Sequence, residues 1–288
     1  MAEGAEKDRT LDRIHEINFN MLSDIDRILS KYGCRYYLFF GGLLGALRHH
    51  DFIPWDNDVD IVMWRTDFEK ALPHLYEELD PELYEIIMPG DYGKKYFDDV
   101  PRVNYKKATI KMDPVYVSYY EDKANRIPID IYFVDRVPED LRGKMLILRL
   151  ELLYGLANAH RWKLEIQNYR GITKAAAVVL YGLGKLFPAD YIRKKTDRIS
   201  RKYDGDPSIH SCRITNDTIH TFSLPFNDKQ FGETIPVPIR DRFFEGPTDP
   251  EECMTIRYGD YMQLPPEEER IPHWGFIPVT EDTFIFDD

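Results

Sequence analysis

The sequence predicts an α+β fold: a mixed β-sheet that carries acidic residues, with additional helices around it. Runs of strand character at residues 36–40, 58–63 and 127–135 alternate with helical segments in the first half of the chain. A long helical stretch then occupies about residues 139–203, and no internal repeat or low-complexity linker divides the chain. We therefore expect residues 1–288 to form a single domain with a helical middle region.

The first elements follow from the spacing of apolar residues. These recur every three or four positions over residues 11–29, which predicts an amphipathic helix, and Tyr32-Gly33 is a typical helix end. The aromatic run 36–40 predicts a strand that ends at Gly41-Gly42. The following residues, 43–48, have the composition of a short helix.

The second strand leads into another helix. After residues 58–63, Thr66 and Glu69 have the spacing of a capping box, which predicts a helix that runs to about Leu79. Residues 83–120 contain several short strand candidates before the strong strand at 127–135.

The remaining elements are mostly helical and then mostly short strands. After Pro138 the apolar spacing is helical, and a second helical stretch, 173–187, precedes a basic helix. From about residue 205 the chain is rich in Pro, Gly and aromatic residues, which predicts short strands with one further helix near 250–258.

Composition excludes several classes of protein. The formal net charge of −12 argues against a nucleic-acid binder, because such proteins bind phosphates through basic patches. A nucleotide diphosphate remains a candidate ligand, since a divalent metal held by carboxylates supplies positive charge. The three cysteines are widely separated, no secretory signal is visible, and no stretch reaches the roughly 18 apolar residues of a membrane span. We expect a cytoplasmic protein with reduced thiols.

Acidic residues stand where a strand enters the predicted core. Asp58 and Asp60 are two positions apart, so in a strand they point to one face while Val59 and Ile61 pack on the other. Such carboxylates raise each other's pKa unless a cation, here Mg²⁺ or Mn²⁺, neutralises them. Asp130 is a third carboxylate inside an apolar strand. Because the chain is acidic and has other Asp pairs at this spacing, a solvated acidic face is the alternative.

The glycine pair Gly41-Gly42 follows a strand and precedes a short helix. Glycines there let backbone N–H groups approach a phosphate, although the pair alone is equally typical of a plain tight turn. The order of strand, Gly-Gly, short helix, strand with two aspartates and strand with a third is more specific. It predicts a nucleotidyltransferase-type palm, in which three carboxylates position metals for in-line attack on a phosphorus.

One long stretch carries a resemblance to a known family. Residues 39–63, FFGGLLGALRHHDFIPWDNDVDIVM, resemble the signature of the LicD family of phosphocholine transferases, which the eukaryotic fukutin-related proteins share. The resemblance continues in IPIDIYFVDRVP, FGETIPVP and YGDYMQLPPEEER and covers about residues 11–273, with little in the helical middle. Asn57 stands where the family commonly has Asp, at a position that we expect to face away from the metal. The cysteine-rich zinc insert of the eukaryotic relatives is absent, so we expect no zinc.

The resemblance implies transfer of a phospho-alcohol, typically phosphocholine, from a CDP-activated donor to a sugar hydroxyl, with release of CMP. The implied acceptor is a cell-surface glycan or teichoic-acid-type precursor, or another lipid-linked sugar. The resemblance places Gly41 and Gly42 on the phosphate-binding turn, Arg48 on the arginine after it, Asp58 and Asp60 on the metal pair, and Asp130 on the third carboxylate.

Several roles stay open at this level. Asp130 is a general base for the acceptor hydroxyl or a further metal ligand. Arg48 clamps phosphate oxygens or is a surface arginine. Trp55, Tyr116 and Tyr119 are candidates for binding a choline cation through their rings, although core packing is the commoner role.

Two other functions compete with this one. An enzyme of the same fold can transfer the nucleotide itself to a small acceptor, and a non-catalytic scaffold can retain the fold. The extended IPWDNDVD block favours phospho-alcohol transfer over the former, and the presence of all three carboxylates argues against the latter.

The segment 171–187 raises a separate question about location. It is apolar for about four turns, too short to span a bilayer, and Lys174, Lys185 and the basic run 193–202 accompany it. The pattern is typical of an internal helix packed on the core. It also fits an interfacial helix that gives the enzyme a peripheral membrane contact near a lipid-linked acceptor.

Overall fold

The structure is a computed structural model that describes residues 2–91, 99–111, 125–160, 166, 169–274, 277–278 and 283–287. Within these ranges the main sheet has seven strands. Five of them lie in the order β1 (Tyr37–Phe39), β2 (Val59–Trp64), β6 (Ile127–Arg136), β4 (Arg102–Tyr105) and β3 (Tyr84–Ile87). The other two are β7 (Ser211–Ile214), which pairs with β6, and β8 (Phe226–Asn227), which pairs with β7. β2 and β6 are parallel and the other pairs are antiparallel, so the sheet is mixed, in agreement with the predicted α+β class.

The long strand β6 organises the centre of this sheet. One edge pairs with β2, whereas the other pairs first with β4 and then with β7. Asn216 fills the gap between these two partners: its Oδ1 accepts from the backbone N of Phe133 at 2.7 Å, and its Nδ2 donates to Ile131 O at 3.4 Å. The chain after β7 is thereby fixed against the middle of β6.

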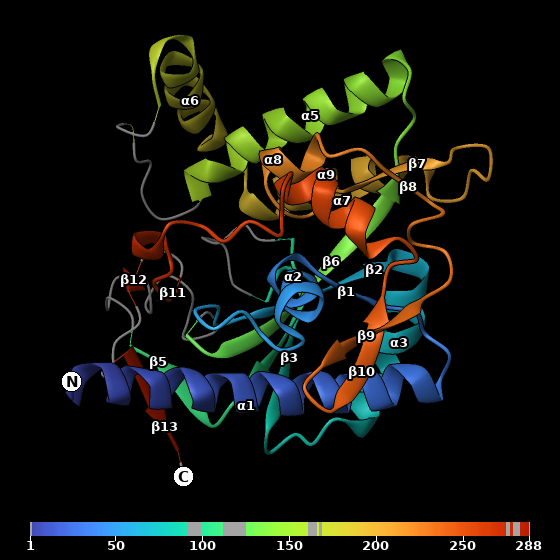
Figure 1. The fold of residues 1–288 in the computed structure, drawn as a ribbon. Helices are drawn as coiled ribbons and strands as arrows, with labels where there is room; N and C mark the ends of the chain where they lie inside the picture. Colours follow the sequence, from blue (N-terminus) through green and yellow to red (C-terminus); the bar gives the residue numbers. More distant parts are fainter. Residues whose placement is uncertain are drawn as a thin grey trace.

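The first helix is the predicted amphipathic one. α1 (Ala2–Lys31) packs against β6 and α3 (Arg65–Glu78), and its apolar positions, such as Ile14 and Ile25, are fully buried. It starts earlier than the apolar spacing predicts and ends as predicted, with Gly33 at a positive φ of 59°. Figure 1 shows α1 running along one side of the molecule.

The predicted capping box is wrong. α3 begins at Arg65, one residue before Thr66, and its N-cap, Trp64, makes no side-chain hydrogen bond. Glu69 is ion-paired with Arg201 instead. Arg201, 132 residues away in the sequence, thus binds the Glu69 side chain that the local spacing predicts to cap the helix.

Among its described residues, the helical middle region contains the α-helices α5 (Leu141–Ala157), α6 (Gly171–Gly184) and α7 (Ala189–Ser200). They lie on the side of the molecule opposite α1 (Figure 1). In α6 the sole buried residue is Gly184, so the interpretation of this segment as an internal helix packed on the core is wrong. Among the described residues, no single helix is long and apolar enough to cross a membrane.

The remaining elements complete the cover of the sheet. A large hydrophobic core contains residues from α1, the sheet, the hairpin of β9 (Ile235–Ile239) and β10 (Arg242–Gly246), and α9. The helix predicted near 250–258 is α9 (Pro250–Tyr258), and α8 (Ile219–Phe222) is short. The other short pairs are β5 (Ala108–Ile110) with β13 (Phe284–Phe286), and β11 (His273–Trp274) with β12 (Ile277–Pro278).

Candidate active site

The parallel pairing of β2 with β6 brings two predicted acidic residues together. Asp60 and Asp130 are register partners, so their side chains leave the same face of the sheet. Val59 and Ile61 are buried on the opposite face, as the alternation predicts. Asp58 lies directly before β2 and is exposed, whereas Asp60 and Asp130 are half-buried.

These carboxylates repel one another. Burial raises the pKa of Asp60 well above its ordinary value, and the charges of Asp58, Asp130, Asp56 and Asp217 raise it further. Loss of hydration among the surrounding protein atoms also raises the pKa of Asp56 and of Asp58, although Asp58 keeps part of its surface exposed, and a hydrogen bond joins these two side chains. We call the five residues the acidic cluster. Sequence reasoning assigned no role to Asp56, and it missed Asp217, which the fixed position of Asn216 brings to the cluster.

The glycine pair lies in the first turn of α2 (Phe40–His49), against the acidic cluster. Phe40 has the positive φ, 46°, at the junction of β1 and α2, so the reversal does not require a glycine. Gly41 is required for space, because a Cβ there would lie 2.1 Å from Oδ2 of Asp56. A Cβ on Gly42 would lie 2.8 Å from Cδ1 of Leu38. The glycines therefore allow the start of α2 to approach the Asp56 carboxylate.

Two polar side chains of α1 hold the loop that carries the aspartates. His15 Nε2 donates to the backbone O of Asp56 at 2.6 Å, and Asn18 Nδ2 donates to Asn57 O at 3.2 Å. The side chain of Asn57 is buried, whereas its neighbours Asp56 and Asp58 are not. This agrees with the expectation that position 57 faces away from the carboxylates.

Asp130 has an ion-pair partner that sequence reasoning missed. Arg102 is its register partner on β4, with Nε 2.9 Å from Oδ1 and Nη2 3.2 Å from Oδ2. The pairing depends on the register of two antiparallel strands, which sequence spacing alone does not define. Asp130 is therefore held in a fixed position at the edge of the acidic cluster.

Tyr258, the last residue of α9, links the acidic cluster to an arginine. Burial raises the pKa of Tyr258, the charge of Arg257 lowers it, and the charges of Asp56, Asp60 and Asp58 raise it. All four charges therefore lie close to the phenol.

Arg257 itself lies over the start of α2. Its guanidinium carbon is 5.4 Å from the ring centroid of Phe40 and 5.1 Å from that of Tyr258. Its buried Nε has no hydrogen-bond partner within the described part of the chain. Sequence reasoning missed this residue, and the signal available was its place directly before YGDYMQLPPEEER.

Arg48 is not beside the glycines. It lies about 10 Å further along α2, given the helical rise, and its Nη1 donates to Tyr261 O at 2.9 Å. Burial lowers its pKa, and the nearby charge of Arg270 lowers it further. The structure therefore places this predicted phosphate-binding residue against the C-terminal segment.

Of the three candidate choline-binding residues, the structure describes only Trp55. Tyr116 and Tyr119 lie outside the described residues. Trp55 is half-buried, with the guanidinium carbon of Arg270 5.7 Å from its ring centroid and the ring of His49 edge-on at 6.1 Å. The Trp55 ring thus has a cation over it, and in this structure the cation is Arg270.

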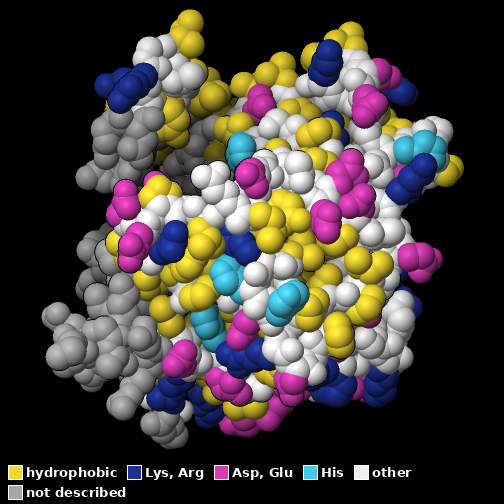
Figure 2. Space-filling view, in the orientation of Figure 1, with side chains coloured by type: hydrophobic (Ala, Val, Ile, Leu, Met, Phe, Trp, Pro, Cys, Tyr) yellow, Lys and Arg dark blue, Asp and Glu magenta, His cyan; other side chains and the backbone are white. Residues whose placement is uncertain are grey.

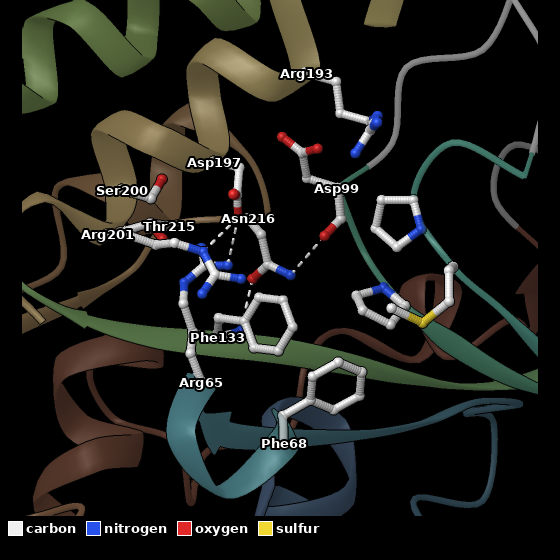
Figure 3. A pocket seen from close by; sticks show the side chains of 13 residues that line it. Arg65, Phe68, Asp99, Phe133, Arg193, Asp197, Ser200, Arg201, Thr215 and Asn216 are labelled. Carbon is white, nitrogen blue, oxygen red and sulfur yellow. Dashed lines mark hydrogen bonds and ion pairs between the residues drawn. The ribbon is translucent and has the colours of Figure 1, made fainter. Parts of the chain in front are cut away.

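A cavity of about 170 Å³ lies apart from the acidic cluster, between β6 and α7 (Figure 3). Phe133 lines it, three positions after Asp130 on β6 and hence on the opposite face of the sheet. Arg65 extends into it from the sheet side and is ion-paired with Asp135 at 2.6 Å and with Asp197 of α7 at 3.0 Å. These contacts join the helical region to the sheet.

The donors of the acidic cluster fit a hard divalent cation. In the described ranges, no three His, Cys, Asp or Glu side chains already stand together as a ligand set. The cluster nevertheless offers carboxylate oxygens, the donors that Mg²⁺ prefers. Among the residues described, Asp58 and Asp60 form no ion pair with Lys or Arg, so no described side-chain cation relieves the repulsion on Asp60. A bound cation would relieve it.

The fold and the site define an α+β protein whose mixed sheet carries an acidic cluster at the start of a helix, near an arginine that pairs with no carboxylate in the part of the chain that the structure describes. Residues 33–140 match the family model described as LicD/FKTN/FKRP, nucleotidyltransferase domain. This range includes Asp58, Asp60 and Asp130.

Individual relatives agree with this family. Lipopolysaccharide cholinephosphotransferase LicD of Haemophilus influenzae is 26% identical over 275 residues, which are 93% of this chain and 97% of that protein. Ribitol 5-phosphate transferase FKRP of Homo sapiens is 52% identical over 40 residues, 14% of this chain and 8% of that protein. The resemblance to LicD is confirmed, and the relatives support a transferase.

Proposed function

We propose that this protein transfers a phospho-alcohol, with phosphocholine as the first choice, from a CDP-activated donor to a sugar hydroxyl, releasing CMP. The acceptor in this proposal is a cell-surface glycan or teichoic-acid-type precursor. The observation that carries the proposal is the acidic cluster at the start of α2, in a chain that matches the LicD family model. A relative along 93% of the chain bears the name lipopolysaccharide cholinephosphotransferase, which supports this donor and acceptor class.

In this proposal the mixed sheet serves as a nucleotidyltransferase-type palm, and residues 1–288 act as one domain in the cytoplasm. Asp58 and Asp60 would hold Mg²⁺ or Mn²⁺. The metal would supply positive charge to the donor diphosphate and to the leaving CMP.

The chain's own residues position the donor and move the proton. The N–H groups at the start of α2, near Gly41 and Gly42, face the donor phosphates. Arg257 donates its unpartnered Nε to a phosphate oxygen. The acceptor oxygen attacks the phosphorus of the phospho-alcohol while the bond to CMP breaks, and Asp130, held by Arg102, takes the hydroxyl proton.

The test is a donor panel. Purified protein is incubated with Mg²⁺, a glycan acceptor and CDP-choline, CDP-ethanolamine, CDP-ribitol or CDP-glycerol, and products are weighed by mass spectrometry. Free CMP with an acceptor that has gained an alcohol phosphate supports the proposal. A CMP-bearing acceptor together with free alcohol phosphate would assign nucleotidyl transfer instead. If none of the donors reacts, the proposal is wrong.

A further inference from the structure

The helix α6 is apolar and yet almost entirely exposed. The exposed fractions are 87% for Ile172, 57% for Val179, 45% for Leu183, and 73% for Leu186 just beyond the helix. At about 100° per residue, Ile172, Val179 and Leu183 fall on one face of the helix. The opposite face holds Gly184, which packs against α5.

Exposed apolar side chains concentrate in this part of the molecule. Of the twenty large hydrophobic residues exposed in the described ranges, twelve fall within residues 141–191. On α5 they are spaced by four, three and four positions, which makes a stripe: Leu141, Met145, Leu148 and Leu152. Figure 1 shows α5 and α6 outermost on the side away from α1, and Figure 2 shows hydrophobic side chains over them with Lys or Arg side chains nearby. We call the exposed apolar residues of α5, α6 and the link to α7 the outer helical surface.

The net charge around this surface is positive, whereas the net charge of the whole chain is negative. Residues 170–202 contain nine Lys or Arg and two Asp, a net charge of +7, in a chain of net charge −12. On α7, Lys194, Lys195 and Arg198 are exposed. A local basic region beside an apolar face is complementary to an anionic lipid surface.

Aromatic residues join the apolar and the basic parts. Phe187 stacks on Tyr191 with ring centroids 5.9 Å apart, and Lys195 Nζ lies 5.8 Å from the Tyr191 ring. Both aromatic residues are exposed. Amphipathic aromatic rings and lysines are the residues that suit the level of lipid headgroups.

We infer that the outer helical surface docks on an anionic lipid surface, with α6 lying in the interface. The 14 residues of α6 are about 21 Å long, shorter than the hydrocarbon core of roughly 30 Å, so the helix lies on the membrane. A second copy of the chain is a poorer occupant. A symmetric dimer through this face would bring a segment of charge +7 against its own copy. The inference does not depend on the transfer reaction proposed above.

Flotation with liposomes tests the inference. The full chain should float with vesicles that contain phosphatidylglycerol at about 50 mM salt, less at about 500 mM salt, and little with pure phosphatidylcholine vesicles. Wild-type protein that stays in the soluble fraction at low salt would overturn the inference.

Paired variants identify the surface. The triple variant Val179→Gln, Leu183→Gln, Leu186→Gln should reduce vesicle binding at least about tenfold, because it removes the exposed apolar side chains without touching the core. Phe243→Gln, with 66% exposure on the distant β9–β10 hairpin, is the matched control and should float like wild type. Lys194→Gln with Lys195→Gln should weaken salt-sensitive binding, whereas Lys70→Gln with Lys229→Gln should not.

Two outcomes would count against the inference. Equal flotation of the triple variant and wild type would show that another surface binds lipid. A lipid-free dimer that the triple variant converts to a monomer in sedimentation would assign the face to a second copy. Flotation requires no turnover, so a failed donor panel leaves this test unaffected.

Discussion

At the level of single residues, the site depends on carboxylates that oppose one another. At Asp60, the charges of Asp58, Asp130, Asp56 and Asp217 add to the cost of burial. We predict that Asp60→Asn lowers CMP release by at least about a hundredfold, the scale expected when one preorganised electrostatic group is lost. The melting temperature should be unchanged or higher, since the change removes repulsion. Asp241→Asn, at an exposed position in the β9–β10 turn, is the control. Near-wild-type turnover by folded Asp60→Asn would contradict the role.

Gly41 gives a second prediction at this scale. Gly41→Ala would place a Cβ 2.1 Å from Oδ2 of Asp56, so the carboxylate must move. We expect lower thermal stability and at least about tenfold slower turnover, because a small displacement of a catalytic group is costly. Gly182→Ala is the matched control: its Cβ meets nothing within 4 Å, and alanine favours a helix.

The same clash allows an internal check on Gly41. Adding Asp56→Ala to Gly41→Ala should restore thermal stability while activity stays low. A double variant as unstable as Gly41→Ala would mean that the glycine is required for another reason.

Among the elements, α9 contributes Arg257 to the donor side of the site. We predict that Arg257→Ala raises the KM for the CDP donor about tenfold with a smaller change in kcat, as expected for a group that binds donor phosphate. Arg242→Ala is the matched control, since Arg242 also stacks on an aromatic ring, 5.5 Å from the centroid of Phe244. Equal effects of the two variants in steady-state kinetics would argue against a donor contact.

A buried ion pair joins α3 to β6, and Asp197 of α7 binds the same arginine. The side chains of Arg65 and Asp135 are 6% and 0% exposed, and Thr215 also donates to Asp135. We predict that Arg65→Met lowers the free energy of unfolding by about 3–5 kcal/mol, because it leaves Asp135 buried and unpaired. Arg142→Met, which removes the exposed pair with Asp140, should cost about 0–1 kcal/mol. Urea unfolding distinguishes the two, and similar midpoints would contradict the prediction.

For the whole molecule, Asp204 makes stability depend on pH. Burial, with the charge of Asp135, raises the pKa of Asp204 to about 7, above its ordinary value of 3.8. The folded protein therefore binds this proton more tightly than the unfolded chain, and stability is lost as pH rises from about 4 through 7. Asp204→Asn imitates the protonated carboxyl. Its melting temperature, relative to wild type, should increase between about pH 4 and pH 7 and then level off. A difference that is constant with pH would refute the assignment.

The sequence predicts the features of the fold and of the site that depend on local patterns of residues. The alternation around Asp58 and Asp60 predicts the buried face of β2, and the order of elements predicts the mixed sheet. Arg102, Asp217 and Arg257 were missed, because each reaches the site through pairing of distant segments. The apolar segment of α6 has the composition of a core helix. Its exposure depends on the position of the helix in the fold, which the local sequence does not specify.

The contact of Gly41 with Asp56 also limits how related sequences can vary. With 2.1 Å between a Cβ at position 41 and the carboxylate at position 56, the two positions are not free to change independently. A relative that has a side chain at the first position is expected to have lost the acid at the second. The combination of glycine and aspartate at these two positions thus offers a simple criterion for separating relatives that keep the acidic cluster from those that keep only the fold.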